Sequence, residues 1–132
     1  MATDENPLKS LIVEGNQNLD LHQLTDLLTD RIAFTSEGEI KFLTDFYEAS
    51  NQQKMLIVLL GAKAKSILFE GQDGFVPSEI IAYDIMPLGS VKSTLKSLLE
   101  DTHEIKKGAD KRYYVPNYVI AKLASRLSKD AK

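Results

Sequence analysis

The stretch that decides the fold runs from residue 77 to residue 115 and reads PSEIIAYDIMPLGSVKSTLKSLLEDTHEIKKGADKRYYV. It predicts a short helix that begins at Pro77, a turn that contains Pro87, and a longer amphipathic helix. Two strand-like runs follow, residues 104–107 and 111–115, with a Gly-Ala-Asp turn between them. The predicted order is therefore helix, turn, helix and hairpin.

The longer helix has two faces of different character. Its apolar residues recur at helical spacing and form one stripe, which consists of Val91, Leu95, Leu98 and Leu99. The opposite face carries Gly89, Ser90, Ser93, Lys96, Ser97 and Glu100, with Lys92 at its border. Small, hydroxyl-bearing and cationic side chains can approach a phosphate backbone, donate hydrogen bonds and reach base edges in a major groove. A polar face of this kind is equally typical of a helix whose outer side is simply solvated.

This order of elements resembles the winged helix-turn-helix family of DNA-binding domains, over residues 52–118. The matching residues are Ser78, Glu79, Ile80 and Ile81 in the shorter helix, Met86 and Pro87 in the turn, and Gly89, Ser90 and Val91 in the longer helix. Two positions depart from the family pattern: Asp84 stands where a buried Leu is usual, and Ile85 where a turn Gly is usual. The amino-terminal part of the chain is not matched to any family.

The resemblance implies a winged helix fold and a transcription regulator that binds double-stranded DNA. The longer helix would lie in the major groove, with Ser90, Lys92, Ser93 and Lys96 facing the bases and phosphates. The hairpin, or wing, would hold the phosphate backbone through Lys106, Lys107, Lys111 and Arg112. Hairpin tips are commonly solvated and charged, so these wing bases have an ordinary structural explanation as well. The alternative is a winged helix module that binds another protein and never touches DNA.

The charge of the chain is unevenly distributed. The protein has 132 residues, a formal net charge of -3 and a composition of 43% hydrophobic and 27% charged residues, which is typical of a soluble globular protein. The first 50 residues contain 3 basic and 10 acidic residues, for a charge of -7, and the remaining 13 basic and 9 acidic residues give +4. This asymmetry indicates a basic working surface beside an acidic amino-terminal unit that could bind a protein partner.

Several classes of function find no support in the residues. The chain has no cysteine, which excludes disulfides, thiolate catalysis and cysteine-based zinc sites. Its two histidines, His22 and His103, belong to no metal or nucleophile signature, so we expect no enzymatic activity, no metal site and no cofactor. The longest aliphatic run, residues 55–60, is too short to span a bilayer, and the acidic start lacks the features of a secretion signal. We therefore expect a cytoplasmic protein without membrane contact.

The whole chain is predicted to be α+β and mainly helical, in four parts. Residues 1–18 form a flexible lead-in, in which Leu11, Ile12 and Val13 could make a short strand. Residues 19–50 form an amino-terminal unit with a helix over residues 20–29, begun by Asp20 and Gln23 in capping-box spacing. A hairpin over residues 31–42 follows, with its turn at residues 36–39. Residues 51–128 form the winged helix domain, and residues 129–132 are a tail.

Two further elements bear on assembly. Residues 55–60 are apolar on all sides, which predicts a helix buried between the two units and begun by a Ser50–Gln53 capping box. The hairpin must rest on a helix or on a third strand, such as residues 11–13, or pair with a second copy in a homodimer. The last helix, which starts at Pro116, would either close over the core or pair with its twin.

Overall fold

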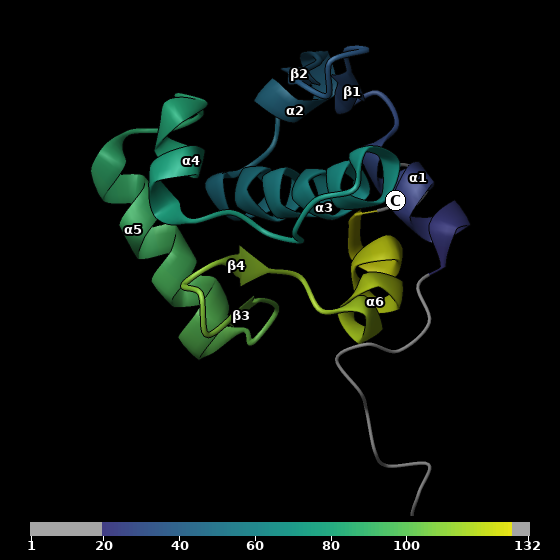
Figure 1. Ribbon diagram of the computed structural model, residues 1–132. Coiled ribbons are helices and arrows are strands. Elements are labelled where there is room, and N and C mark those ends of the chain that lie inside the picture. Colours follow the sequence, from purple (N-terminus) through teal and green to yellow (C-terminus); the bar gives the residue numbers. More distant parts are fainter. Residues whose placement is uncertain (1–19, 128–132) are drawn as a thin grey trace, which may run out of the picture.

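The computed structural model describes residues 20–127, with side chains through Ser125 (Figure 1). The predicted lead-in, its strand at residues 11–13 and the tail at residues 129–132 lie outside the described residues. Within residues 20–127 the fold is α+β and mainly helical, with two antiparallel two-stranded hairpins. The predicted fold class is therefore confirmed at this level.

The amino-terminal unit follows its local sequence signals. Helix α1 (Leu21–Leu28) begins after Asp20, whose carboxylate accepts a hydrogen bond of 3.1 Å from the Gln23 backbone N–H. Strands β1 (Ile32–Phe34) and β2 (Ile40–Phe42) form the predicted hairpin, in which Ile32 lies opposite Phe42.

A short helix, α2 (Thr44–Tyr47), connects this hairpin to the next element. The sequence predicts one helical turn here, with both aromatic side chains near the core. Phe46 is fully buried, whereas Tyr47 is 60% exposed, so the prediction is right for Phe46 and wrong for Tyr47. One turn of helix on the surface can point only one of two adjacent side chains inward.

Helix α3 (Asn51–Phe69) is the central element of the fold (Figure 1). It begins with the predicted capping box, in which Ser50 and Gln53 satisfy each other's backbone N–H groups. Residues 55–60 are buried on every side of the helix, as their unbroken apolar run predicts. At Gly61, an added Cβ would lie 3.0 Å from the Ile32 side chain, so the hairpin packs closely on α3. The hairpin therefore rests on a helix, one of the supports predicted for it.

The second part of the chain also packs around α3. It consists of α4 (Pro77–Ala82), α5 (Leu88–Lys96), the π-helical turn η2 (Ser97–Asp101), β3 (Lys106–Lys107), β4 (Tyr113–Tyr114) and α6 (Asn117–Leu127). Helix α6 packs against α1, with Val119, Ile120 and Leu123 buried, and so closes over the core. Figure 1 shows α1 and α6 at one end of α3, and α4 and α5 at the other.

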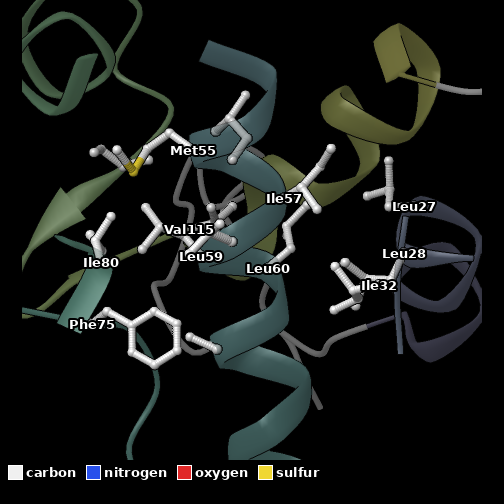
Figure 2. Packing of buried hydrophobic residues seen from close by; sticks show 14 of the residues in the cluster. Leu27, Leu28, Ile32, Met55, Ile57, Leu59, Leu60, Phe75, Ile80 and Val115 are labelled. Atoms are coloured by element: carbon white, nitrogen blue, oxygen red, sulfur yellow. The ribbon is translucent and has the colours of Figure 1, made fainter. Parts of the chain in front are cut away.

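One buried cluster joins both parts of the chain. Figure 2 shows Leu27 and Leu28 of α1 on one side of α3, and Phe75 and Ile80 on the other side. All four belong to the same cluster of buried apolar residues. The helix predicted to tie the two units together does so by burying every side of residues 55–60.

A single ion pair is formed by a buried lysine of this central helix. Lys63 is only 5% exposed, and its ammonium donates a hydrogen bond to the carboxylate of Asp73 in the loop after α3. Burial raises the pKa of Asp73 above its ordinary value, and the nearby positive charge of Lys63 opposes that rise without cancelling it. The pair therefore anchors the loop to α3 at an electrostatic cost.

Candidate nucleic-acid interface

The turn between α4 and α5 sets the direction of the longer helix. Its left-handed residue is Asp84, with φ +56°, a conformation that Asp tolerates better than most residues. Ile85 and Met86 follow and are both buried, and Pro87 precedes the first residue of α5. The resemblance aligns Ile85 with the usual turn Gly, but in the structure Asp84 has the left-handed conformation and Ile85 is buried. A buried, β-branched side chain could not adopt the left-handed conformation without strain.

Helix α5 packs one face on the core and presents the other. Val91, Leu95 and Leu98 are buried and Leu99 is half-buried, so the predicted apolar stripe is confirmed. On the outer side, the structure places Lys92, Ser93 and Lys96 in exposed positions and Ser90 in a half-buried one. All four predicted residues of this helix therefore lie within three turns of one element.

The end of the helix differs from the sequence expectation of a regular helix to about residue 100. From Ser97 to Asp101 the backbone is a π-helix, in which the Thr102 N–H reaches the Ser97 carbonyl at 3.1 Å. This widened turn leaves Leu98 buried while Glu100 and Asp101 remain exposed. The Glu104 N–H then donates to the Leu98 carbonyl at 3.0 Å, which connects the helix end to the start of the second hairpin.

The second hairpin is short and is held to the body of the protein by a third backbone segment. Residues 106–107 pair with residues 113–114, fewer than the predicted runs of residues 104–107 and 111–115. Glu104 is not part of the strand: it is buried, 1% exposed, with its carboxylate 3.9 Å from the Lys122 ammonium. On the other side of β4, Phe75 and Tyr113 exchange two backbone hydrogen bonds of 3.0 and 2.8 Å. The β4 segment therefore lies between β3 and the backbone at Phe75.

Three lysines project from this hairpin. Lys106, Lys107 and Lys111 are all exposed. The ammonium groups of Lys106 and Lys107 lie 5.5 Å from the ring centroids of Tyr118 and Tyr113 respectively, within cation–π range. Lys111 occupies the tip in a left-handed conformation, φ +68°, with its N–H donating to the Gly108 carbonyl at 3.0 Å. The predicted turn at residues 108–110 is therefore confirmed.

Arg112 has a different environment from the lysines around it. Its guanidinium donates to the Gly74 carbonyl at 3.1 Å and to the Glu79 carboxylate at 3.2 Å, and lies 3.6 Å from the carboxylate of Asp110. Glu79 also accepts a 2.9 Å hydrogen bond from the Val76 N–H at the start of α4. The sequence predicts Arg112 as a phosphate contact, but in the structure its planar fork joins the hairpin to α4.

Within the described residues, the predicted DNA-binding lysines differ from Arg112 in having no ion pair. Among residues 20–127, none of the lysines at positions 92, 96, 106, 107 and 111 forms an ion pair. Their charges are therefore not compensated by a partner within hydrogen-bonding distance in the part of the chain that the structure describes. Exposed ammonium groups on two neighbouring elements can bind the oxygen atoms of an extended polyanion.

One residue next to this surface has no signal in the local sequence. Gln52, exposed in the first turn of α3, donates a hydrogen bond of 3.0 Å to the Ser97 hydroxyl. The two residues are 45 positions apart, so no periodicity or motif relates them. The contact adds an amide group beside the outer face of α5, where hydrogen bonds to phosphate or base edges are formed in protein–DNA complexes.

Two further features that residues 20–127 could contain are a metal-binding group and a membrane-spanning helix. These residues hold no group of three or more His, Asp or Glu side chains that could bind a metal ion, and His22 and His103 are both exposed. No helix among them is both long enough and apolar enough to cross a bilayer. No family model, no curated protein and no solved structure matches this chain.

Proposed function

We propose that this chain is a winged helix protein that binds double-stranded DNA, as a transcription regulator does. In this proposal α4 and α5 are the helix-turn-helix, α5 lies in the major groove, and the β3–β4 hairpin is the wing. The order of elements supports it: α3, the bridge at Phe75, α4, α5 with its π-helical end η2, and the hairpin follow one another along the chain. The left-handed Asp84 supplies the turn conformation for which the family commonly uses Gly.

The observation that carries the proposal is the set of five exposed lysines without an ion pair in the described part of the chain. Lys92 and Lys96 lie on the outer face of α5, and Lys106, Lys107 and Lys111 lie on the adjacent hairpin. Ser90 and Ser93 supply hydroxyl groups on the same helix, α5. Phosphate contacts from such groups set affinity, and hydrogen bonds to base edges set specificity.

Arg112 takes a supporting role in this proposal. Its bonds to Gly74 and Glu79 fix the hairpin relative to α4, and the lysines around it provide the charge. A guanidinium has five N–H donors, so it can hold these partners and still attract a phosphate weakly. We therefore expect its loss to act first through the placement of the wing.

Fluorescence anisotropy with a random labelled duplex, measured over a series of salt concentrations, tests the proposal. Non-specific binders of this kind have Kd values of about 10⁻⁴ to 10⁻⁶ M at physiological salt, and affinity increases as salt falls. In the Lys92→Ala/Lys96→Ala variant, we expect weaker binding and a slope of log K against log salt that is smaller by about two units, because each phosphate contact contributes roughly 0.9. Lys41→Ala is the matched control, since Lys41 is an exposed lysine of the other hairpin.

Absence of binding at tens of micromolar protein in low salt would refute DNA as the partner, as would equal salt slopes for the double variant and the control. A second candidate is then a winged helix module that binds protein. Exposed apolar side chains at the helix-turn-helix support it: Leu88 at the first position of α5 is 53% exposed, and Ile81 in α4 is 38% exposed. Two predictions about partners are separate from this test: a protein partner for the acidic amino-terminal unit, and a homodimer. Sedimentation of the same preparation measures whether the protein is a dimer.

A further inference from the structure

An apolar groove lies at the carboxyl-terminal end of α3, the end away from Gln52. It has a volume of about 340 Å³ and is formed by α1, β1 and the last turns of α3. Its lining includes six large aliphatic side chains, those of Leu21, Leu24, Leu28, Ile32, Ile67 and Leu68. Thr25 and Thr29 are the polar residues among its lining, and no charged side chain lines it. Its occupant must therefore be apolar, which excludes a nucleic acid or a phosphate group.

The rim of the groove is unusually exposed for aliphatic residues. Leu21 is 55% exposed, Ile67 is 45% exposed and Leu68 is 63% exposed. They come from two helices and meet at one groove, so they are not the isolated surface leucines that any protein carries. A contiguous apolar patch of this kind marks a contact surface.

We propose that the groove is covered by the apolar segment Leu11-Ile12-Val13 of the same chain. Outside the described residues, this sequence contains one run of consecutive large aliphatic residues, and it is this segment. The five residues after position 127 are Ser-Lys-Asp-Ala-Lys and have no large apolar side chain. Chemistry therefore selects the amino-terminal segment over the carboxyl-terminal one.

The segment is joined to the groove by a stretch of chain that is long enough for it to reach. The segment is joined to α1 at Leu21, which is itself part of the rim. The seven residues from Glu14 to Asp20 can span up to about 23 Å at roughly 3.3 Å per residue. Helix α1, along which the groove runs, is eight residues or about 12 Å long. The segment can thus reach any point of the groove without altering the described fold.

The tether also decides between this segment and a second copy of the protein. A short linker holds its segment at an effective concentration on the order of millimolar, whereas a second copy at micromolar concentration is about a thousand-fold more dilute. Within residues 20–127, β1 pairs only with β2, so one edge of the first hairpin adjoins the groove without a strand partner. The segment could add to that edge or fill the groove with its side chains alone.

Disulfide trapping tests the proposal cleanly, because the natural chain has no cysteine. Leu11, Ile12 and Val13 are replaced by Cys one at a time in full-length protein that also carries Leu68→Cys. The matched control set carries Asp26→Cys in place of Leu68→Cys, since Asp26 is exposed on α1 but does not line the groove. Disulfide formation in oxidised glutathione is followed by mass spectrometry and non-reducing gels. A bond requires Cα atoms about 4.4–6.8 Å apart.

We expect at least one pair with Leu68→Cys to form an intramolecular disulfide about ten-fold faster than its Asp26→Cys counterpart, because docking raises the local concentration beyond that of a free tether. Adding an Asp substitution at a neighbouring segment position, such as Leu11→Asp beside Ile12→Cys, should remove the difference. Equal rates for the groove and control pairs would overturn the proposal. Faster formation of linked dimers than of linked monomers would overturn it as well and would assign the groove to a second copy.

Discussion

Gly74 gives the sharpest test of how the second hairpin is held. The residue has φ +88°, and an added Cβ would lie 2.4 Å from the Tyr113 carbonyl oxygen, which belongs to the backbone and cannot move aside. Gly74→Ala therefore introduces a left-handed strain of about 1–2 kcal/mol. It also displaces the two hydrogen bonds between Phe75 and Tyr113, which contribute about 1 kcal/mol each. We expect a total loss of about 3–4 kcal/mol in the free energy of unfolding.

Gly71 provides the control in the same loop. An added Cβ there would meet nothing within 4 Å, and Gly71 is not among the positive-φ glycines. Gly71→Ala should change stability by less than about 1 kcal/mol, in the stabilising direction if its backbone suits Ala. Urea unfolding of both variants measures the difference, with an unchanged m-value as the sign that the native state stays compact.

A second readout localises the effect. The Tyr113 N–H donates to the Phe75 carbonyl at 2.8 Å, so its hydrogen exchange should be faster in Gly74→Ala than in Gly71→Ala. Equal losses of stability in the two variants, or an unchanged exchange rate at Tyr113, would refute the claim that this bridge holds the hairpin in place.

Two further predictions concern the core and the buried ion pair. Leu60→Ala should lower the free energy of unfolding, measured in urea, by about 2–5 kcal/mol because Leu60 is fully buried. Leu88→Ala should change it by less than about 0.5 kcal/mol because Leu88 is 53% exposed. Similar losses in the two variants would contradict the described core. Burial raises the pKa of Asp73 above 3.8, so its protonated form is favoured by folding. The stability of the wild type relative to Asp73→Asn should therefore be greatest below pH 3.8 and fall as pH rises through the folded pKa, and a difference that grows with pH would contradict this sign.

The elements that the sequence predicted well are those whose signals are local. The Asp20 cap, the Ser50–Gln53 capping box and the turn at residues 36–39 each involve residues within a few positions of one another. Burial of residues 55–60 was also predictable, because an unbroken apolar run leaves no side of a helix for solvent. For such elements the sequence neighbours are also the spatial neighbours, so spacing alone is sufficient.

The features without a local sequence signal are contacts that join distant positions and backbone conformations that residue type does not predict. Arg112 and Glu79 are 33 positions apart, so no local pattern distinguishes this structural arginine from the exposed lysines beside it. The left-handed conformation of Asp84 could not be predicted, because Asp, unlike Gly, gives no strong signal for it. The π-helical end of the longer helix is followed by a hydrogen bond from the Glu104 N–H to the Leu98 carbonyl, a contact that helical periodicity does not predict.

The central helix separates the two proposed surfaces and makes their tests independent. Gln52, in the first turn of α3, contacts Ser97 beside the outer face of α5, whereas Ile67 near the other end of α3 lines the apolar groove. Fifteen residues of helix between them correspond to about 22 Å, more than twice the distance over which exposed charges act at physiological salt. Residues 55–60 lie between these two ends and are buried in the core, so their side chains belong to neither surface. Loss of DNA binding in Lys92→Ala/Lys96→Ala therefore leaves the groove unchanged, and an unoccupied groove does not weaken the case for the lysine surface.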